Sequence, residues 1–263
     1  PGLVDIVNSG IHKDMDYYTF LDSSSSFSHC FSEIAELGFL YSGELSEALP
    51  LIRQLGLKME KQMFESTGNV NTQKGIIFLM ALATFSSAYC IAKNGVFDLT
   101  SFQQTSKEIS NEILLEFEQS QEVTHGVQCA NTYGFELGGG ARYEASSGFK
   151  TTLNYGFPIL QEEGLIHTNQ AKKESTLTKA LLSLMAHNND TNVLYRSDLT
   201  SLEELKEYSK QALNAYQTEN YLKFYQKIDE FCMRKRVSPG GAADLLAVSV
   251  FIYFTYNKFN DAC

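Results

Sequence analysis

The sequence lacks an excess of basic residues. Lysine and arginine total 21 against 31 aspartates and glutamates, which gives a formal net charge of −10 over 263 residues. Proteins that bind nucleic acid neutralise phosphates with a basic surface, so we expect no nucleic-acid partner. A small anionic ligand remains compatible with this charge, provided that a few cations gather around it.

Paired cysteines are also missing. The chain has five cysteines, no C-x-x-C pair, and wide spacing between Cys30, Cys90, Cys129, Cys232 and Cys263. This pattern favours neither a disulfide framework nor a zinc or redox pair, and it fits a reducing compartment. No charged-then-apolar leader opens the sequence at Pro1, so we expect a cytoplasmic protein, and we also expect an N-terminal segment upstream of Pro1 to be missing.

No apolar run is long enough to indicate a membrane protein. The most apolar stretch, residues 76–92, is short for a bilayer span and contains Thr84, Ser86 and Ser87. A helix buried on all sides is apolar all round, so this stretch predicts a buried central helix and no membrane association.

Strand patterns and the common catalytic motifs are absent. No sustained period-two alternation occurs, and there is no G-x-S-x-G, G-x-x-x-x-G-K-[ST] or H-E-x-x-H. Apolar residues instead recur every three or four positions, which predicts an all-α fold that we expect to form one domain over residues 1–263. The clearest runs are Phe102, Ile109, Ile113 and Phe117; Leu177, Leu181, Leu184 and Met185; and Tyr221, Phe224, Tyr225, Ile228, Phe231 and Cys232.

Several helix starts have recognisable signals. Thr200 with Glu203, and Ser201 with Glu204, have the spacing of capping boxes. Pro50 and Pro239 stand where first-turn prolines are tolerated.

Polar segments rich in glycine, asparagine and threonine separate the helical runs. They cover residues 1–16, 67–75, 124–149, 187–197 and 237–244. Such residues serve either as plain turns or as sites at helix ends. Lys74, Arg142 and Arg196 fall in these segments, and their side chains suit phosphate oxygens, although surface ion pairs are an equally good interpretation.

Carboxylates and histidines in the same segments suggest further chemistry. His12, Asp14 and Asp16 alternate, so in an extended loop they can face one Mg²⁺ ion, and Asp190 offers another oxygen; helix capping is the alternative for these aspartates. His125 precedes a glycine and can act as a proton donor near neutral pH. For the other histidines, His29, His167 and His187, we expect structural roles.

Six ordered motifs resemble the triphosphoribosyl-dephospho-coenzyme A synthase family from end to end. They are PGLVDIVNSGIHKDMD (residues 1–16), STGNVNTQKG (66–75), THG (124–126), GARYEASSGF (140–149), DTNVLYR (190–196) and SPGGAADLLA (238–247). Two positions depart from the usual wording. Gln73 replaces a histidine, which weakens any catalytic histidine there, and Tyr143 replaces a glycine.

The resemblance implies that the 2′-hydroxyl of 3′-dephospho-CoA attacks the anomeric carbon of ATP, with adenine leaving and Mg²⁺ assisting. The product would be the prosthetic-group precursor of citrate lyase or malonate decarboxylase, attached to the acyl carrier protein by a separate transferase. For this reaction we expect Glu144, or alternatively Glu60, as the base, a catalytic role for His125, and metal binding by Asp14, Asp16 and Asp190. The motifs imply substrate binding by Asn8, His12, Asn71, Thr72, Lys74, Arg142, Asn192, Arg196, Ser238, Gly240, Gly241 and Asp244.

Two other functions fit the same residues. A magnesium-dependent all-α glycohydrolase of ADP-ribosyl or nucleoside bonds would use these carboxylates with water as the nucleophile. A non-enzymatic binding module would use the polar segments only as caps and turns, and nucleotides would not stabilise it.

Overall fold

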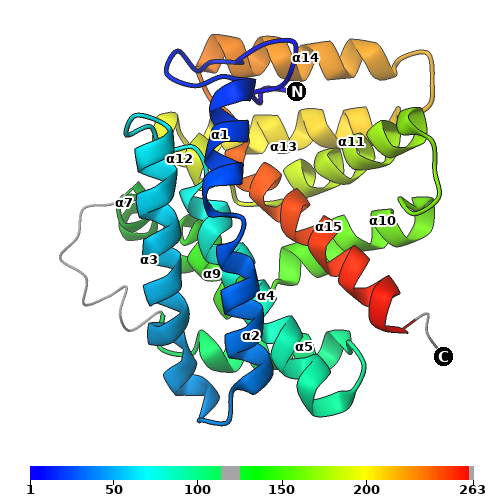
Figure 1. Cartoon of the computed structure of the whole chain (residues 1–263). Coiled ribbons are helices and arrows are strands. Elements are labelled where there is room, and N and C mark those ends of the chain that lie inside the picture. The colour runs from blue at the N-terminus through cyan, green and yellow to red at the C-terminus, as the bar shows by residue number, and fades with distance from the viewer. Residues whose placement is uncertain (114–124, 261–263) are drawn as a thin grey trace. The chain divides into compact units, whose positions relative to one another are not determined.

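The computed structural model describes residues 1–113 and 125–260, and every regular element in these ranges is helical (Figure 1). The predicted all-α fold is therefore confirmed. Phe117, Thr124 and Cys263 lie outside the described residues. By internal contacts the chain divides into a first unit (residues 1–13, 121–140 and 150–250) and a second unit (14–120, 141–149 and 251–263). The expectation of one domain over residues 1–263 stays a prediction.

The second unit is built on the apolar helix α4. This helix packs along α2, and the two backbones approach closely, since a Cβ on Gly38 would lie 2.5 Å from the carbonyl oxygen of Phe85. The buried central helix predicted over residues 76–92 is thus present. The unit contains α1 (Tyr17–Phe27), α2 (Cys30–Leu40), η1 (Leu45–Glu47), α3 (Ala48–Ser66), α4 (Lys74–Asn94), α5 (Leu99–Ile109) and most of α9 (Gly140–Ser146), together with the last part of α15 (Gly240–Asn260).

By length and composition, α4 is the one helix among the described residues that is apolar enough to cross a membrane. Within its most apolar window, 56% of the residues are buried inside the protein. A core helix of a folded domain has this same composition.

The first unit places α11, α13 and α14 side by side (Figure 1). Its elements are α7 (His125–Tyr133), α8 (Phe135–Gly138), the π-helical turn η2 (Thr152–Gly156), α10 (Phe157–Glu163), α11 (Gln170–His187), α12 (Thr191–Arg196), α13 (Leu199–Asn214), α14 (Tyr221–Lys235) and the start of α15.

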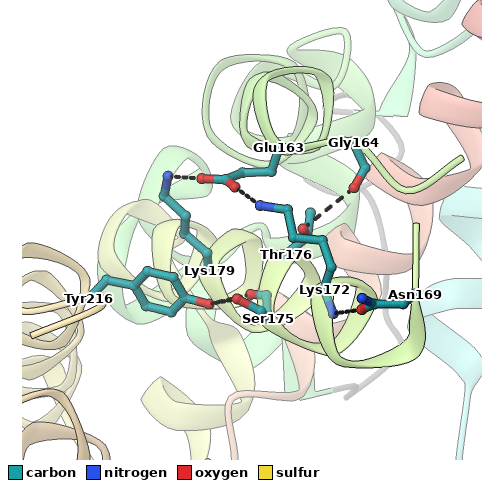
Figure 2. A network of polar contacts seen from close by, with 8 residues as sticks. All are labelled: Glu163, Gly164, Asn169, Lys172, Ser175, Thr176, Lys179 and Tyr216. Carbon is teal, nitrogen blue, oxygen red and sulfur yellow. Dashed lines mark hydrogen bonds and ion pairs between the residues drawn. The ribbon is translucent and has the colours of Figure 1, made fainter. Parts of the chain in front are cut away.

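A polar network fixes the connection from α10 to α11 in this unit (Figure 2). The carboxylate of Glu163, at the end of α10, accepts hydrogen bonds from Lys172 and, at 2.5 Å, from Lys179. These bonds, first from Lys172 and then from Lys179, lower the pKa of Glu163. The side chain of Asn169 caps α11 by accepting the backbone N–H of Lys172 at 2.9 Å. One carboxylate thus joins two turns of α11 to α10.

The structure corrects three local predictions. Helix α13 begins at Leu199, and Asp198 caps it by accepting the N–H of Ser201 at 2.7 Å, so the capping boxes at Thr200 and Ser201 are wrong. Helix α5 ends at Ile109, so the predicted run toward Ile113 is interrupted. The polar segments at 124–149 and 187–197 contain short helices, and Glu144 lies on α9. Pro50 does stand in the first turn of α3.

Candidate active site

Asp190 connects two of the motif segments of the first unit. It is the residue before α12, and its Oδ1 accepts the backbone N–H of Asn192 at 3.0 Å. Its Oδ2 accepts the N–H of Ala242, in the first turn of α15, also at 3.0 Å. The side chain is buried, with 3% of the residue exposed. One carboxylate therefore satisfies amides at the start of both helices, as expected where helix N-termini leave N–H groups unpaired.

Two glycines allow this close approach. A Cβ on Gly241 would lie 3.0 Å from Oδ2 of Asp190, and one on Gly240 would lie 2.9 Å from Nδ2 of Asn192. Neither glycine has a left-handed backbone. Glycine is needed at these positions because a side chain would lack room. The SPGG segment thus brings the N-terminus of α15 against Asp190.

The surroundings of Asp190 and Asp244 disfavour the ionised form of both side chains. Burial raises the pKa of Asp190 to about 6, although the N–H groups of Ala242 and Asn192 work in the other direction. Burial, followed by the charge of Asp190, raises the pKa of Asp244 well above its usual range. Burial and repulsion by a second carboxylate both disfavour the charged form of a carboxyl group. Both carboxyl groups are therefore protonated more readily than exposed ones.

The N-terminal loop is anchored to the same region. Ser238 is buried, and its hydroxyl donates to the carbonyl of Gly2 at 2.8 Å. The N–H of Gly2 donates to Oδ1 of Asp229 on α14 at 2.7 Å. Further along the loop, Oδ1 of Asn8 accepts the N–H of Gly10 at 2.8 Å. Asn8 is exposed and His12 is partly buried.

A stacked pair of rings lies at the other end of the DTNVLYR motif. The imidazole of His125, at the start of α7, stacks on the ring of Tyr195 on α12, with centroids 3.6 Å apart and an interplanar angle of 19°. Both residues are exposed, as is Arg196, which follows Tyr195. The glycine-rich turn also reaches α12, since a Cβ on Gly140 would lie 2.7 Å from Oγ1 of Thr191.

These contacts connect segments that are distant in sequence. Pairwise contacts within the first unit link the loop after Pro1 to the segment before α15, the start of α15 to Asp190, and α12 to both the start of α7 and the turn at Gly140. Of the predicted site residues, this unit holds Asn8, His12, His125, Asp190, Asn192, Arg196, Ser238, Gly240, Gly241 and Asp244.

The second unit holds the other predicted residues, and Lys74 is paired with Glu60 there. Lys74 is the first residue of α4, and its Nζ lies 3.0 Å from Oε2 of Glu60 on α3. Oδ1 of Asn71 accepts the backbone N–H of Lys74 at 3.2 Å. The Lys74 side chain is 52% exposed and that of Glu60 is 18% exposed. A proposed phosphate-binding cation and a proposed base are thus neighbours.

The residues before Lys74 are bonded to α1. The hydroxyl of Thr72 donates to Oγ of Ser23 at 2.7 Å. Oε1 of Gln73 accepts from Ser23 at 2.7 Å, and Nε2 of Gln73 donates to Ser24 at 2.9 Å. At the position where a histidine was expected from the family wording, Gln73 therefore connects α1 to the start of α4.

Asp16 caps α1, the role that was the alternative to metal binding. Its Oδ1 accepts the N–H of Thr19 at 2.9 Å and the Thr19 hydroxyl at 2.8 Å, and these bonds lower its pKa. Asp14 and Asp16 are both exposed. Arg142 and Glu144 lie on α9, where Glu144 is buried with 4% of its surface exposed and Arg142 is partly buried. Metal binding by Asp14, Asp16 and Asp190 stays a prediction.

Sequence reasoning missed several residues that shape these places. Tyr195, Asp229 and Ser23 make the contacts described above, but each lies in a helix and is bonded to a residue more than 40 positions away. No local pattern singles out Ser23 and Asp229, whereas Tyr195 lies within the DTNVLYR motif. Gly140 had a visible signal, because it closes a run of three glycines.

Comparison with known proteins gives matches over almost the whole chain. The family model for ATP:dephospho-CoA triphosphoribosyl transferase matches residues 1–262. A 2-(5''-triphosphoribosyl)-3'-dephosphocoenzyme-A synthase from Haemophilus ducreyi is 32% identical over 273 aligned residues, which cover 95% of this chain and 81% of the relative. The protein of that name from Escherichia fergusonii is 32% identical over 257 residues, covering 96% and 84%.

One solved structure has a similar fold. It is a crystal structure assigned as a triphosphoribosyl-dephospho-CoA synthase from Archaeoglobus fulgidus, with a TM-score of 0.57 and 17% sequence identity. The likeness covers 90% of this chain and 99% of that one. At this identity it shows the fold alone.

Proposed function

The chain belongs to the family of ATP:dephospho-CoA triphosphoribosyl transferases, and we propose that it joins the triphosphoribosyl group of ATP to the 2′-hydroxyl of 3′-dephospho-CoA. Adenine is released and the triphosphate stays intact. The match of the family model to residues 1–262 carries this proposal. The pairwise contacts between motif segments in the first unit support it.

The reaction is a substitution at the anomeric carbon of the ATP ribose. The 2′-oxygen forms a bond to that carbon, the bond to N9 of adenine breaks, and the departing base takes up a proton. The hydroxyl proton goes to a base on the protein. Such a transition state has oxocarbenium character, so it needs nearby negative charge and acid–base groups, which typically contribute about 10²–10⁴-fold each.

Glu60 and Glu144 are the proposed alternatives for the base. Glu60 is mostly buried and lies beside the ammonium group of Lys74, and Glu144 is almost fully buried on α9. A carboxylate with little exposure is shielded from water, which strengthens its interaction with a developing positive charge. His125 is the proposed proton donor to the leaving base, and its ring position is set by stacking on Tyr195.

Lys74, Arg142 and Arg196 are the proposed clamp on the triphosphate. Forked guanidinium groups and an ammonium group suit phosphate oxygens. Lys74 and Arg196 are exposed, so a ligand can reach them. Amides in the first turn of α15 offer a further anion-binding position, because helix N-termini attract negative charge. Asn8, His12, Asn71, Thr72 and Asn192 would complete the contacts to substrate.

Asp14 and Asp16 fit Mg²⁺ by their chemistry. Both offer hard carboxylate oxygens at the surface, and the Thr19 bonds of Asp16 all fall on Oδ1. When bound, Mg²⁺ would screen and orient the triphosphate. Asp190 fits less well, since each of its oxygens already accepts a backbone N–H inside the protein.

The product would serve as the precursor of the prosthetic group of citrate lyase or malonate decarboxylase. A separate transferase would attach it to the acyl carrier protein. We propose a cytoplasmic protein that works without membrane or nucleic acid, in keeping with its net charge of −10.

Mass spectrometry of the coenzyme tests the proposal. The protein is incubated with ATP, Mg²⁺ and 3′-dephospho-CoA, and the coenzyme is expected to gain one triphosphoribosyl group. An unchanged coenzyme together with free adenine or another base would indicate the glycohydrolase. An unchanged coenzyme with no turnover, and no thermal stabilisation by nucleotide, would indicate the binding module.

A further inference from the structure

The start of α2, in the second unit, gathers three different metal-binding side chains. They are His29, Cys30 and Glu33, whose ligand atoms all lie within 4.8 Å of one another. His29 directly precedes α2 and has a helical backbone, so His29 and Glu33 are separated by one helical turn and share a face. Cys30 is buried, whereas His29 is exposed. The cluster is remote in sequence from the six motifs and has no part in the proposed reaction.

The distances suit a tetrahedral transition-metal ion. Zinc binds sulfur at about 2.3 Å and imidazole nitrogen at about 2.0–2.1 Å, so tetrahedral angles place these two ligand atoms about 3.5 Å apart. Sγ of Cys30 and Nε2 of His29 are 3.4 Å apart. Two of the ligand atoms therefore already have the required separation, and a carboxylate oxygen of Glu33 lies within 4.8 Å of both.

The chemistry of the donors distinguishes this cluster from a magnesium site. A thiolate, an imidazole and one carboxylate select zinc-like ions, whereas Mg²⁺ prefers oxygen ligands alone. Asp14 and Asp16 offer only oxygens. The cluster at His29 and the proposed Mg²⁺ site at Asp14 and Asp16 should therefore not compete for the same ion.

Two residues of α3 surround the cluster. Nζ of Lys58 donates to both oxygens of Glu33, at 2.7 and 2.9 Å. Sγ of Cys30 donates to Oε1 of Gln62 at 3.4 Å. When the Cys30 thiol loses its proton it becomes an acceptor. The Gln62 amide can then turn and donate from its NH₂ group to the thiolate. Lys58 competes with a metal ion for Glu33, which favours an exchangeable ion.

We propose that His29, Cys30 and Glu33 bind one Zn²⁺ ion, with water at the fourth position. On binding, the ion forms a bond to Sγ of Cys30 and the thiol proton leaves to the solvent. No oxidant or reductant takes part. Three protein ligands and one open position make this an accessible site whose ion exchanges with the surroundings.

Titration with Co²⁺ tests the site in the complete, metal-free protein without a polyhistidine tag. We expect one equivalent to bind and to produce a thiolate-to-cobalt charge-transfer band, and added Zn²⁺ should displace it. His29→Gln and Cys30→Ser should each weaken binding about tenfold or more, and Cys30→Ser should abolish the band. The Glu33→Gln protein should also bind more weakly.

Cys90→Ser is the matched control. Cys90 is a buried cysteine of the same unit whose Sγ lies 3.4 Å from Oγ1 of Thr105, so its variant should titrate like the original protein. His29 is exposed, so His29→Gln keeps the test valid even where Cys30→Ser affects folding. Lack of stoichiometric binding, or an equal band in the Cys30→Ser protein, would overturn the proposal.

Discussion

The carboxylate of Asp190 accepts the backbone N–H of Ala242 at 3.0 Å, across 52 positions of sequence. The same carboxylate caps α12 through Asn192. A buried side chain thus sets the position of α12 relative to the first turn of α15, within one unit. Because the proposed substrate-binding residues Asn192, Arg196 and Gly241 belong to these two elements, their geometry depends on Asp190.

Replacing Asp190 with asparagine should lower both stability and activity. The amide would turn an NH₂ group toward one of the two backbone N–H donors, so one buried donor loses its acceptor, at a cost of about 1–3 kcal/mol. Denaturant unfolding measures this loss, and adenine release should fall in parallel. Asp198→Asn is the control, because Asp198 is an exposed helix cap and asparagine caps equally well. Equal unfolding free energies for the two variants would contradict the connecting role of Asp190.

Alanine at Gly241 should destabilise the protein. Its Cβ would lie 3.0–3.1 Å from three atoms of the Asp190 carboxyl group, which backbone bonds prevent from moving away. Overpacking of this kind costs about 1–3 kcal/mol. Gly56→Ala is the control, since Gly56 lies within α3 with nothing within 4 Å of the added Cβ, and it should stabilise by about 0.5–1 kcal/mol. Thermal unfolding of both proteins gives the comparison, and a neutral Gly241→Ala would show that the contact can relax.

The Glu163 network should contribute to stability in a pH-dependent way. Hydrogen bonds from Lys172 and Lys179 lower the pKa of Glu163 in the folded state. Its contribution is therefore fully present above the unfolded pKa of about 4.3 and is lost as the pH falls through the folded value. Glu163→Gln should cost about 1–3 kcal/mol at pH 7, and this cost should shrink as the pH drops below about 4.

Unfolding of the Glu163→Gln and original proteins at several pH values measures this difference. Glu162→Gln is the control, because Glu162 is exposed and its substitution should stay within about 0.5 kcal/mol. A cost that is the same at pH 3.5 and pH 7 would show that the ionised carboxylate is not what stabilises the connection.

Lys74 and Glu60 should affect different steps of the reaction. Lys74→Met should weaken ATP binding, since a clamp on the triphosphate acts on binding, and Glu60→Gln should lower kcat with little change in KM if Glu60 is the base. The exposed pair of Lys61 and Glu65 on α3, the helix of Glu60, provides matched controls, Lys61→Met and Glu65→Gln. Unchanged ATP affinity in Lys74→Met would assign Lys74 to the scaffold or to coenzyme binding. Unchanged kcat in Glu60→Gln would leave Glu144 as the candidate base.

Periodicity predicted the fold well, because the spacing of apolar residues along a helix follows directly from which faces of that helix are buried. The buried helix α4 is an example: its apolar residues lie on every side, and ten of its residues, seven of them apolar, are buried. Helix ends were less predictable. At α13 two capping patterns beginning at Thr200 and Ser201 competed with Asp198, and the aspartate two positions earlier is the residue that caps.

The arrangement of the site could be predicted only in part. The polar segments were visible as breaks in periodicity, and their motifs pointed to the family. Contacts such as His125 with Tyr195, or Ser238 with Gly2, depend on how distant helices pack, and no local pattern encodes them. The same holds for Asp190, whose role as a cap for two helices requires knowing where α15 begins.

Coenzyme dependence of adenine release is the most direct measurement of the proposed activity. Adenine is quantified by chromatography from the protein with ATP and Mg²⁺, in the presence and absence of 3′-dephospho-CoA. We predict release only when the coenzyme is present, because its 2′-hydroxyl is the nucleophile. Adenine released at the same rate without the coenzyme would contradict the transferase and assign the nucleophile to water.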